Sequence, residues 1–194
     1  MRSAVFLDRD GTINEEVGYL HRIEDFRLLP GAAEGIRAIN RLGFVTVMIT
    51  NQAGIGRGYY TERDVARLHE HMLATLMALG ARIDAVYYCP HHPADQCACR
   101  KPAAGLFERA AHDLNLDLSA SIAIGDKLSD LTPVKSLGGR TILVLTGYGY
   151  QELEKAREAG WEPDFVAADL FNAAQWIAHS FPNEASDRLA QRQE

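Results

Sequence analysis

The sequence predicts an α/β fold, a three-layer α/β/α sandwich around a mainly parallel, Rossmann-like sheet. Three observations favour this fold. Short β-rich runs alternate with longer amphipathic stretches along the chain, and this order gives right-handed β–α–β crossovers. Several of the short runs are almost wholly apolar, as strands buried on both faces of a parallel sheet are. The 194 residues are enough for one well-buried domain.

Strands and helices are expected in strict alternation. The predicted strands cover 4–8, 44–50, 85–89, 121–125, 141–146 and, with a weaker pattern, 164–167. The predicted helices cover 32–42, 61–80, 105–114, 128–137, 151–159 and 170–179. We expect residues 1–180 to form a single domain. Residues 181–194 are polar, lack a strong apolar stripe and are predicted to be a frayed or disordered tail.

The helix after Thr61 has the clearest pattern. Thr61 is a good N-cap with Asp64 three residues later, and Gly80 closes the helix. Its buried face is predicted to carry Val65, Leu68, Met72, Leu76 and Leu79. His69 and His71 lie two residues apart, so they face different ways. We expect both of these histidines at the surface.

Composition excludes several classes of protein. The net charge of −6, from 20 basic and 26 acidic residues, argues against bulk nucleic-acid binding, which requires a basic surface. No apolar run approaches the ~20 residues that a membrane span needs, and the apolar run 4–7 is too short for a signal-peptide core. The expected location is the cytoplasm. Three cysteines are an odd count that does not suit a disulfide framework.

Two carboxylates end the first predicted strand. Asp8 and Asp10 are separated by one residue and followed by Gly11, so in an extended chain they project to the same side. The carboxyl ends of strands are where open α/β sheets bind ligands. Two adjacent carboxylates repel each other and call for a cation or a shifted pKa. An ordinary Asp-Gly turn is the alternative for this segment taken alone.

The second predicted strand ends in Thr50-Asn51-Gln52 and continues into a run of three glycines, Gly54, Gly56 and Gly58. The hydroxyl and backbone amides of this segment are natural donors to an oxyanion such as phosphate. The glycine spacing does not match a dinucleotide fingerprint, and a flexible surface loop is the alternative.

The loop after the third predicted strand, residues 89–99, contains every cysteine of the chain. Cys89, Cys97 and Cys99 lie beside His91 and His92, and three thiolates with one imidazole are a complete tetrahedral set for zinc. The two histidines compete for the fourth position, and the C-x-H spacing favours His91. Four protein ligands leave no open position, so we expect a structural staple.

Further charged residues flank the later elements. Lys101 precedes Pro102 and a predicted helix, and a cation near a helix N-terminus makes an anion site. A solvated basic pair with Arg100 is the alternative. Asp126 ends the fourth strand and would complete an oxygen-rich magnesium site with Asp8, although it could equally be a helix N-cap.

The order D-x-D-G-T, then Thr50, Lys101 and G-D-x-x-x-D resembles the four-part signature of haloacid dehalogenase superfamily phosphotransferases. More narrowly, F-L-D-R-D-G-T-I-N, T-N-Q-A-G-I-G-R-G, Y-Y-C-P-H-H-P and C-x-C-R-K-P are similar to the branch that contains heptose-bisphosphate phosphatases and histidinol-phosphatases. These motifs span roughly residues 4–146. The resemblance also favours His91 as the zinc ligand.

The resemblance implies a magnesium-dependent phosphatase. Asp8 would be the nucleophile that forms an aspartyl-phosphate, Asp10 the general acid and base, and Thr50 and Lys101 the groups that hold the phosphoryl oxygens. Asp8, the Asp10 carbonyl and Asp126 would bind magnesium. The expected substrate contacts are Arg9, Glu16, Gly18, Tyr19, Asn51, Gln52, Arg100 and Lys127, and Asp130 would support the site from behind.

The intervals between the motifs are too short for a separate cap domain of ~50 or more residues, so we expect a capless, open site. The branch implies a small phosphorylated sugar as the partner, with removal of the C7 phosphate of a heptose 1,7-bisphosphate expected. We expect the enzyme to be a monomer. Histidinol phosphate or another small sugar phosphate is the alternative substrate. A zinc-stapled binding module without catalysis, and phosphoryl transfer to a sugar, are alternative functions.

Overall fold

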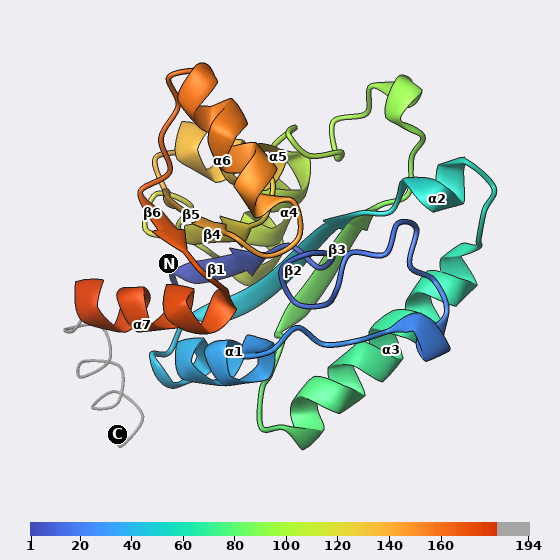
Figure 1. Ribbon diagram of the computed structural model, residues 1–194, viewed down its shortest axis with the longest axis horizontal. Coiled ribbons are helices and arrows are strands. Elements are labelled where there is room, and N and C mark those ends of the chain that lie inside the picture. Colours follow the sequence, from blue (N-terminus) through green and yellow to red (C-terminus); the bar gives the residue numbers. More distant parts are fainter. Residues whose placement is uncertain (182–194) are drawn as a thin grey trace.

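The computed structural model describes residues 1–181, and within them it contains a six-stranded sheet whose strands are all parallel. Across the sheet, the strands follow the order β3 (Ala85–Cys89), β2 (Val45–Asn51), β1 (Ala4–Leu7), β4 (Ile122–Gly125), β5 (Arg140–Val144) and β6 (Phe165–Ala167). The chain builds outwards from β1 to one edge and then from β4 to the other (Figure 1). This order leaves a switch point between β1 and β4, where such sheets bind ligands.

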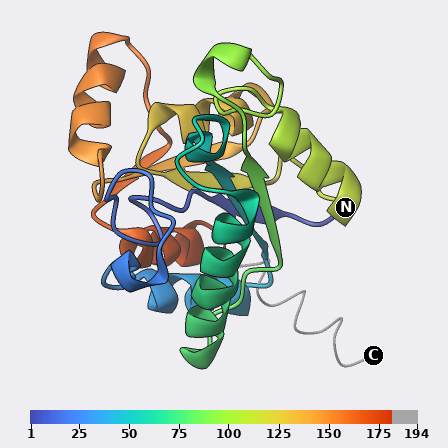
Figure 2. The same ribbon diagram turned by 90° about the vertical axis from the view of Figure 1, so that its right-hand side faces the viewer.

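Helices cover both faces of the sheet (Figures 1 and 2). One layer contains α1 (Ala32–Arg41), α3 (Glu62–Ala78) and α7 (Leu170–Ser180). The other contains α4 (Gly105–Leu114), α5 (Leu128–Ser136) and α6 (Gly149–Glu158). The short elements η1 (Ile23–Asp25), α2 (Ala53–Gly56) and η2 (Pro93–Asp95) lie in the loops that follow β1, β2 and β3.

Two apolar cores sit on the two faces of the sheet, and the strands contribute to both. In β1, Val5 and Leu7 pack into the core under α1, α3 and α7, whereas Ala4 and Phe6 pack into the core under α4 and α5. All four side chains are at most 1 % exposed. Burial on both faces explains why the strand is apolar throughout instead of alternating with polar residues. The predicted three-layer sandwich is confirmed.

Most predicted boundaries differ from the observed ones by one or two residues, as strand and helix ends commonly do. The predicted N-cap of α3 is present, because Thr61 and Asp64 form a reciprocal capping box. Leu79 is an exception to the predicted buried face. It lies beyond the last residue of α3 and is 47 % exposed.

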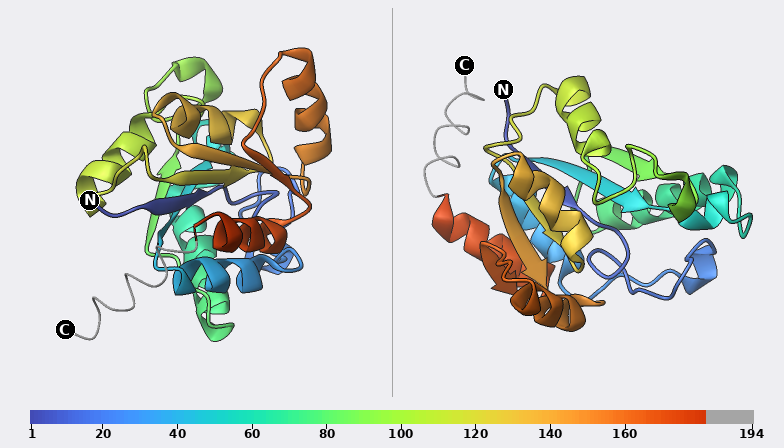
Figure 3. Two further views of the ribbon diagram at one scale, coloured as in Figure 1. Left: turned by 90° about the vertical axis from the view of Figure 1, so that its left-hand side faces the viewer. Right: turned by 90° about the horizontal axis from the view of Figure 1, so that it is seen from above.

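Within residues 1–181, no separate cap domain covers the carboxyl ends of the strands. The loops after β1 and β2 lie on the same side of the molecule (Figure 3, right panel). In the described part of the chain, no helix combines the length and apolar character needed to cross a membrane. The predicted polar tail lies, from residue 182 onward, outside the described residues.

Candidate active site

Asp8 stands at the switch point of the sheet. It follows β1 directly, and its backbone N–H donates to the Ile124 carbonyl of β4 at 3.1 Å. The register pairs Leu7 with Ile124, so Asp8 and the Gly125-Asp126 segment leave the sheet side by side. Strand pairing alone therefore brings together two carboxylates that are far apart in the sequence.

Three carboxylates converge here. Asp8, Asp126 and Asp130 each offer an oxygen within 4.8 Å of the others, and all three side chains are buried. One Asp126 oxygen, Oδ2, accepts from the Tyr148 backbone N–H at 2.9 Å, whereas Oδ1 is buried without a hydrogen-bond partner. Gly11 has a φ of +85°, and a Cβ there would lie 2.3 Å from Asp126 Oδ2, so only glycine fits this close approach.

Lys101 supplies the positive charge within this cluster. Its Nζ lies 2.7 Å from Asp8 Oδ1 and 2.8 Å from Asp130 Oδ1, and it donates to the Ile49 carbonyl at 2.6 Å. The side chain is almost fully buried. The helix N-terminus does not adjoin Lys101, since α4 begins only at Gly105. The lysine belongs to the carboxylate cluster.

The electrostatics of the cluster favour the binding of a cation. Burial raises the pKa of Asp8 to about 6, against the opposing pull of Lys101 and together with repulsion from Asp130. Burial and the neighbouring carboxylates raise the pKa of Asp126 to about 8. A single lysine does not neutralise three buried carboxylates. The unpartnered Asp126 oxygen and this excess of negative charge fit a hard divalent cation with oxygen ligands.

Asp10 is held by four hydrogen bonds. Arg9 donates to both carboxylate oxygens, from Nε to Oδ1 at 3.0 Å and from Nη2 to Oδ2 at 2.9 Å. Asn14 donates to Oδ1 at 3.0 Å and Gln52 to Oδ2 at 3.2 Å. Burial alone would raise the pKa of Asp10, but the Arg9 charge and these donors hold it below its ordinary value. Asp10 also lines the cavity described below.

Arg9 was predicted to contact substrate, but the structure does not bring its side chain to the cavity. Its side chain is fully buried and is not part of the cavity lining. Besides Asp10, it contacts the Leu20 carbonyl at 3.2 Å and His69 Nε2 at 3.1 Å. The expectation that His69 lies at the surface is wrong, since this residue is only 6 % exposed. His69 follows Val65 by four residues, so helical spacing itself places it on the buried face.

The last two residues of β2 and the residue after them both line the cavity and hold neighbouring residues in place. Thr50 lines the cavity, and its Oγ1 accepts from Gln52 Nε2 at 2.9 Å. Asn51 also lines the cavity, but its amide forms two hydrogen bonds with the Lys101 backbone, at 3.0 and 3.1 Å. Gln52 is only 2 % exposed and bridges Asp10 to the Tyr60 hydroxyl. Asn51 and Gln52 thus hold the residues around them as well as bordering the cavity.

A cavity of about 570 Å³ opens in front of Asp8. The loop after β1 contributes three predicted residues, Glu16, Gly18 and Tyr19. Arg100 and Lys127, which were also predicted to contact substrate, line the same cavity. Lys127 pairs with Glu16 at 3.0 Å, and one Arg100 nitrogen, Nη1, is buried without a hydrogen-bond partner. Asp130 accepts from the Lys127 backbone N–H and contacts Lys101, which agrees with its predicted supporting position.

Six further lining residues were missed, namely Ala53, Arg57, Tyr60, Pro93, Ser129 and Tyr148. The Lys127 ammonium lies 4.5 Å from the centre of the Tyr148 ring. Arg57 lies within the glycine run after β2, Tyr60 follows that run, and Tyr148 follows β5. No spacing pattern distinguishes a lining residue from any other loop residue, although every one of these positions follows the carboxyl end of a strand.

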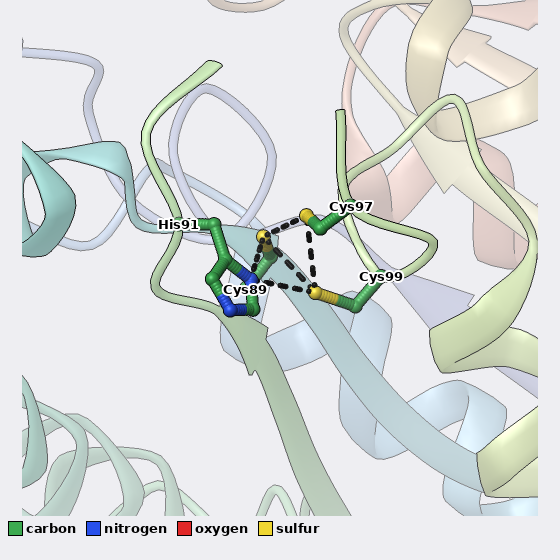
Figure 4. A group of neighbouring side chains, drawn as sticks. All are labelled: Cys89, His91, Cys97 and Cys99. Atoms are coloured by element: carbon green, nitrogen blue, oxygen red, sulfur yellow. Dashed lines mark hydrogen bonds between the residues drawn. The ribbon is translucent and has the colours of Figure 1, made fainter. Parts of the chain in front are cut away.

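A second cluster lies on the loop after β3, where Cys89, His91, Cys97 and Cys99 point toward one another (Figure 4). The sulfur atoms are 3.3 to 3.5 Å apart. The Nδ1 atom of His91 lies 3.1 Å from the Cys99 sulfur and 3.6 Å from the Cys89 sulfur. All three cysteines are free of disulfides. Three thiols and one imidazole nitrogen converging on one point fit a tetrahedral zinc ion.

His92 is not part of this cluster. Its Nδ1 accepts from the Ala94 backbone N–H at 3.1 Å and caps η2, so of the two histidines the structure brings only His91 to the cysteines. The loop packs tightly on α2, because a Cβ at Gly56 would lie 2.3 Å from the His92 backbone nitrogen.

The comparison with known families agrees with this geometry. Residues 98–173 match the family model described as HAD-hydrolase-like. That description names the class of protein that the doubly wound sheet and the acidic site at its switch point define.

The relatives are more specific. A D-glycero-D-manno-heptose-1,7-bisphosphate 7-phosphatase from Thermosynechococcus vestitus is 43 % identical over 188 residues, which cover 91 % of this chain and 95 % of the relative. The D-glycero-β-D-manno-heptose-1,7-bisphosphate 7-phosphatase of Escherichia coli K12 is 37 % identical over 185 residues, 91 % and 88 % of the two chains.

A crystal structure of the D,D-heptose 1,7-bisphosphate phosphatase from B. bronchiseptica, complexed with magnesium and phosphate, superposes with a TM-score of 0.85 at 32 % identity. The match covers 92 % of this chain and 99 % of the other. The chain therefore belongs to the D-glycero-D-manno-heptose-1,7-bisphosphate 7-phosphatase family of HAD-like hydrolases, and it is a phosphatase.

Proposed function

We propose that this phosphatase hydrolyses the C7 phosphate of D-glycero-D-manno-heptose 1,7-bisphosphate in a magnesium-dependent reaction. The observation that carries the proposal is the charge distribution of the cavity. Asp8, Thr50 and Lys101 line it, and so do three further cations, Arg57, Arg100 and Lys127. A substrate with two phosphates suits a cavity lined by four cationic side chains, and the family relationship supports the identity of the sugar.

Magnesium would be held by the Asp8 carboxylate, the Asp10 carbonyl and Asp126. The buried, unpartnered Asp126 oxygen and the raised pKa values of Asp8 and Asp126 support this choice. When bound, the ion supplies the positive charge that lets these carboxylates and a phosphoryl group share one site.

Asp8 acts as the nucleophile. A carboxylate oxygen forms a bond to phosphorus while the bond from phosphorus to the sugar oxygen breaks, which leaves an aspartyl-phosphate. Thr50 Oγ1 and Lys101 Nζ donate to the phosphoryl oxygens and stabilise the charge of the transition state. Water then releases phosphate and regenerates Asp8.

Asp10 moves the protons of both steps. In the first step it protonates the leaving sugar oxygen, and in the second step it accepts a proton from the attacking water. Its lowered pKa suits the base of the second step. The negative charge of the phosphate that enters beside Asp10 raises this pKa and prepares it for the first step.

The Cys/His cluster is proposed to bind zinc as a structural ion. Its four side chains satisfy tetrahedral coordination without an open position, and Cys99 immediately precedes Arg100 and Lys101 in the chain. The ion would therefore fix the loop that carries two cavity cations. The proposal also includes a monomer, a single phosphatase domain over residues 1–180 and a cytoplasmic location, where thiols stay reduced.

The test is a side-by-side assay of phosphate release with magnesium from both anomers of heptose 1,7-bisphosphate, from histidinol phosphate and from a simple sugar monophosphate. The proposal expects the highest kcat/KM for one heptose bisphosphate anomer, with the C1 phosphate retained in the product. Preference for histidinol phosphate would support the alternative substrate instead. Sugar phosphate formed from an added acceptor sugar would indicate transfer in place of hydrolysis.

A further inference from the structure

The arginine between the two site aspartates is enclosed by protein. Arg9 is fully buried, and its guanidinium donates to both Asp10 oxygens, to the Leu20 carbonyl and to His69. A guanidinium that donates two parallel bonds fixes the plane of the carboxylate that it contacts. The orientation of Asp10 therefore depends on what holds Arg9.

His69 is the side-chain acceptor on the far side of Arg9. It comes from α3, sixty positions away in the sequence, and its Nε2 lies 3.1 Å from Arg9 Nη1. Burial and the Arg9 charge lower the pKa of His69 to about 3, so the imidazole is neutral at working pH. Since arginine only donates hydrogen bonds, Nε2 of His69 is the acceptor and Nδ1 carries the proton.

We propose that His69 is a positioning residue for the proton-transferring Asp10 and acts on it through Arg9. The inference rests on the proposed function of Asp10 and adds a residue that touches neither substrate nor metal. Without an acceptor at position 69, Arg9 Nη1 would be a buried donor with no partner, and the guanidinium would shift to find one. Asp10 would turn with it, whereas Asp8 and Lys101 make no contact with His69.

The proposal has a signature in the kinetics. An alkoxide leaving group needs a proton from Asp10, whereas 4-nitrophenolate leaves without one. Loss of orientation at Asp10 should therefore lower kcat/KM for the sugar phosphate and leave kcat/KM for 4-nitrophenyl phosphate nearly unchanged. Hydrolysis of the aspartyl-phosphate is common to both substrates and uses Asp10 as base. With the aryl ester, kcat and KM should therefore fall together.

The experiment compares His69→Leu, His69→Gln and the matched control His71→Leu. His71 lies on the same helix, and its ring contacts Phe26. We expect His69→Leu to lose about 10- to 100-fold in kcat/KM for heptose 1,7-bisphosphate and less than about threefold for 4-nitrophenyl phosphate. His69→Gln offers an amide oxygen near the former Nε2 and should recover most of the loss. His71→Leu should match the wild type.

Equal losses of kcat/KM on the two substrates would overturn the proposal, since a merely structural defect acts on both. No loss on the sugar phosphate would overturn it as well. Should the wild type cleave only other alkyl phosphates, the assigned substrate is wrong, and the comparison of alkyl with aryl esters still decides the role of His69. An enzyme that releases no phosphate from any alkyl ester would refute both proposals together.

A measurement on the unaltered protein makes the test independent of how the variants fold. Long-range ¹H–¹⁵N correlation spectra of the imidazoles distinguish the protonated ring nitrogen from the bare one. The proposal requires a neutral His69 with its proton on Nδ1. A proton on Nε2 would rule out the hydrogen bond from Arg9 and, with it, the positioning role.

Discussion

The carboxylate cluster after β1 and β4 and the Cys/His cluster after β3 differ in what fixes them. The register of the sheet sets the backbone of Asp8 and Asp126, and both side chains are buried. The residues of the Cys/His cluster lie, apart from Cys89 at the end of β3, on a loop whose only helical element is the single turn of η2. A metal bound at the first cluster finds its ligands in place, whereas a metal at the second would hold its own loop together.

The two clusters also meet. Asn51 ends β2, next to Cys89 in the register of the sheet, and its amide forms two hydrogen bonds with the Lys101 backbone. Lys101 in turn contacts Asp8 and Asp130. A disturbance of the thiol loop can therefore reach Lys101, the proposed catalytic lysine, although the carboxylates do not depend on the loop for their backbone positions. The difference between a site built on strands and a site built on a loop is thus open to direct tests.

The largest effect is expected from Asp8→Asn. Removal of the proposed nucleophile should lower kcat by about 10⁴-fold or more. The metal-free fold should be preserved or slightly stabilised, because one buried carboxylate of a repelling group is gone. Phosphate release and thermal unfolding measure the two effects. Glu108→Gln on the exposed face of α4 serves as control and should change neither. A variant with residual activity above one per cent would contradict the assignment.

Disruption of the Cys/His cluster should act on the fold first and on activity second. We expect His91→Ala to lose the bound zinc and to lower Tm by on the order of 10 °C, with activity reduced through Lys101. His92→Ala is the matched control, because this neighbouring imidazole only caps η2 and should leave zinc content unchanged. Elemental analysis and calorimetry are the measurements. Equal zinc content in the two variants would show that His91 is not a ligand.

The connection between the two sites is tested at Asn51. Asn51→Ala should lower kcat about tenfold while zinc content stays constant, because Lys101 loses both backbone hydrogen bonds to β2. Asn40 provides a close control. Its amide forms the same two-bond exchange with the Arg82 backbone, at 2.8 and 3.0 Å, away from the cavity. Asn40→Ala should reduce stability and leave kcat unchanged. Similar kcat values for the two variants would mean that the two clusters are energetically independent.

The sequence predicts the carboxylate cluster better than the side-chain contacts around it, and the reason is physical. Apolar runs identify strands, and residues just beyond parallel strands must meet at one edge, so the amino-acid sequence alone is enough to group Asp8, Thr50 and Asp126. The Cys/His cluster could likewise be predicted from the sequence, because Cys89, Cys97 and Cys99 all lie in one short loop. The orientation of a side chain beyond the end of a strand depends on the groups that it contacts. No pattern in the sequence specifies those contacts.

Arg9 and His69 illustrate this limit from two sides. The position of Arg9 between two site aspartates suggested contact with substrate, but a side chain that alternates with its neighbours along an extended backbone points away from them. His69 was recoverable, since it stands four residues after Val65 and three before Met72, both fully buried. The spacing between His69 and His71 does not reveal this, because it says only that the two histidines face different ways. The contact between Arg9 and His69 forms only when α3 packs beside the loop after β1.

The smallest expected effect comes from the pH dependence of His69, which supports the carboxylate site from behind and does not touch the thiol loop. Its pKa is about 3 in the folded protein against an ordinary value of 6.5, so between these values the unfolded chain binds the proton and the folded chain does not. The stability contributed by neutral His69 is therefore complete above pH 6.5 and lost as the pH falls toward 3, by up to about 1.4 kcal/mol per pH unit.

Urea unfolding of the wild type and His69→Gln at pH 7.5 and 5.5 measures this loss. The stability advantage of the wild type should shrink by about 1 kcal/mol at the lower pH, whereas His71→Gln, on the same helix, should show no such change. An advantage that is equal at both pH values would mean that His69 is protonated inside the folded protein, and Arg9 would then lack the acceptor that keeps Asp10 in place.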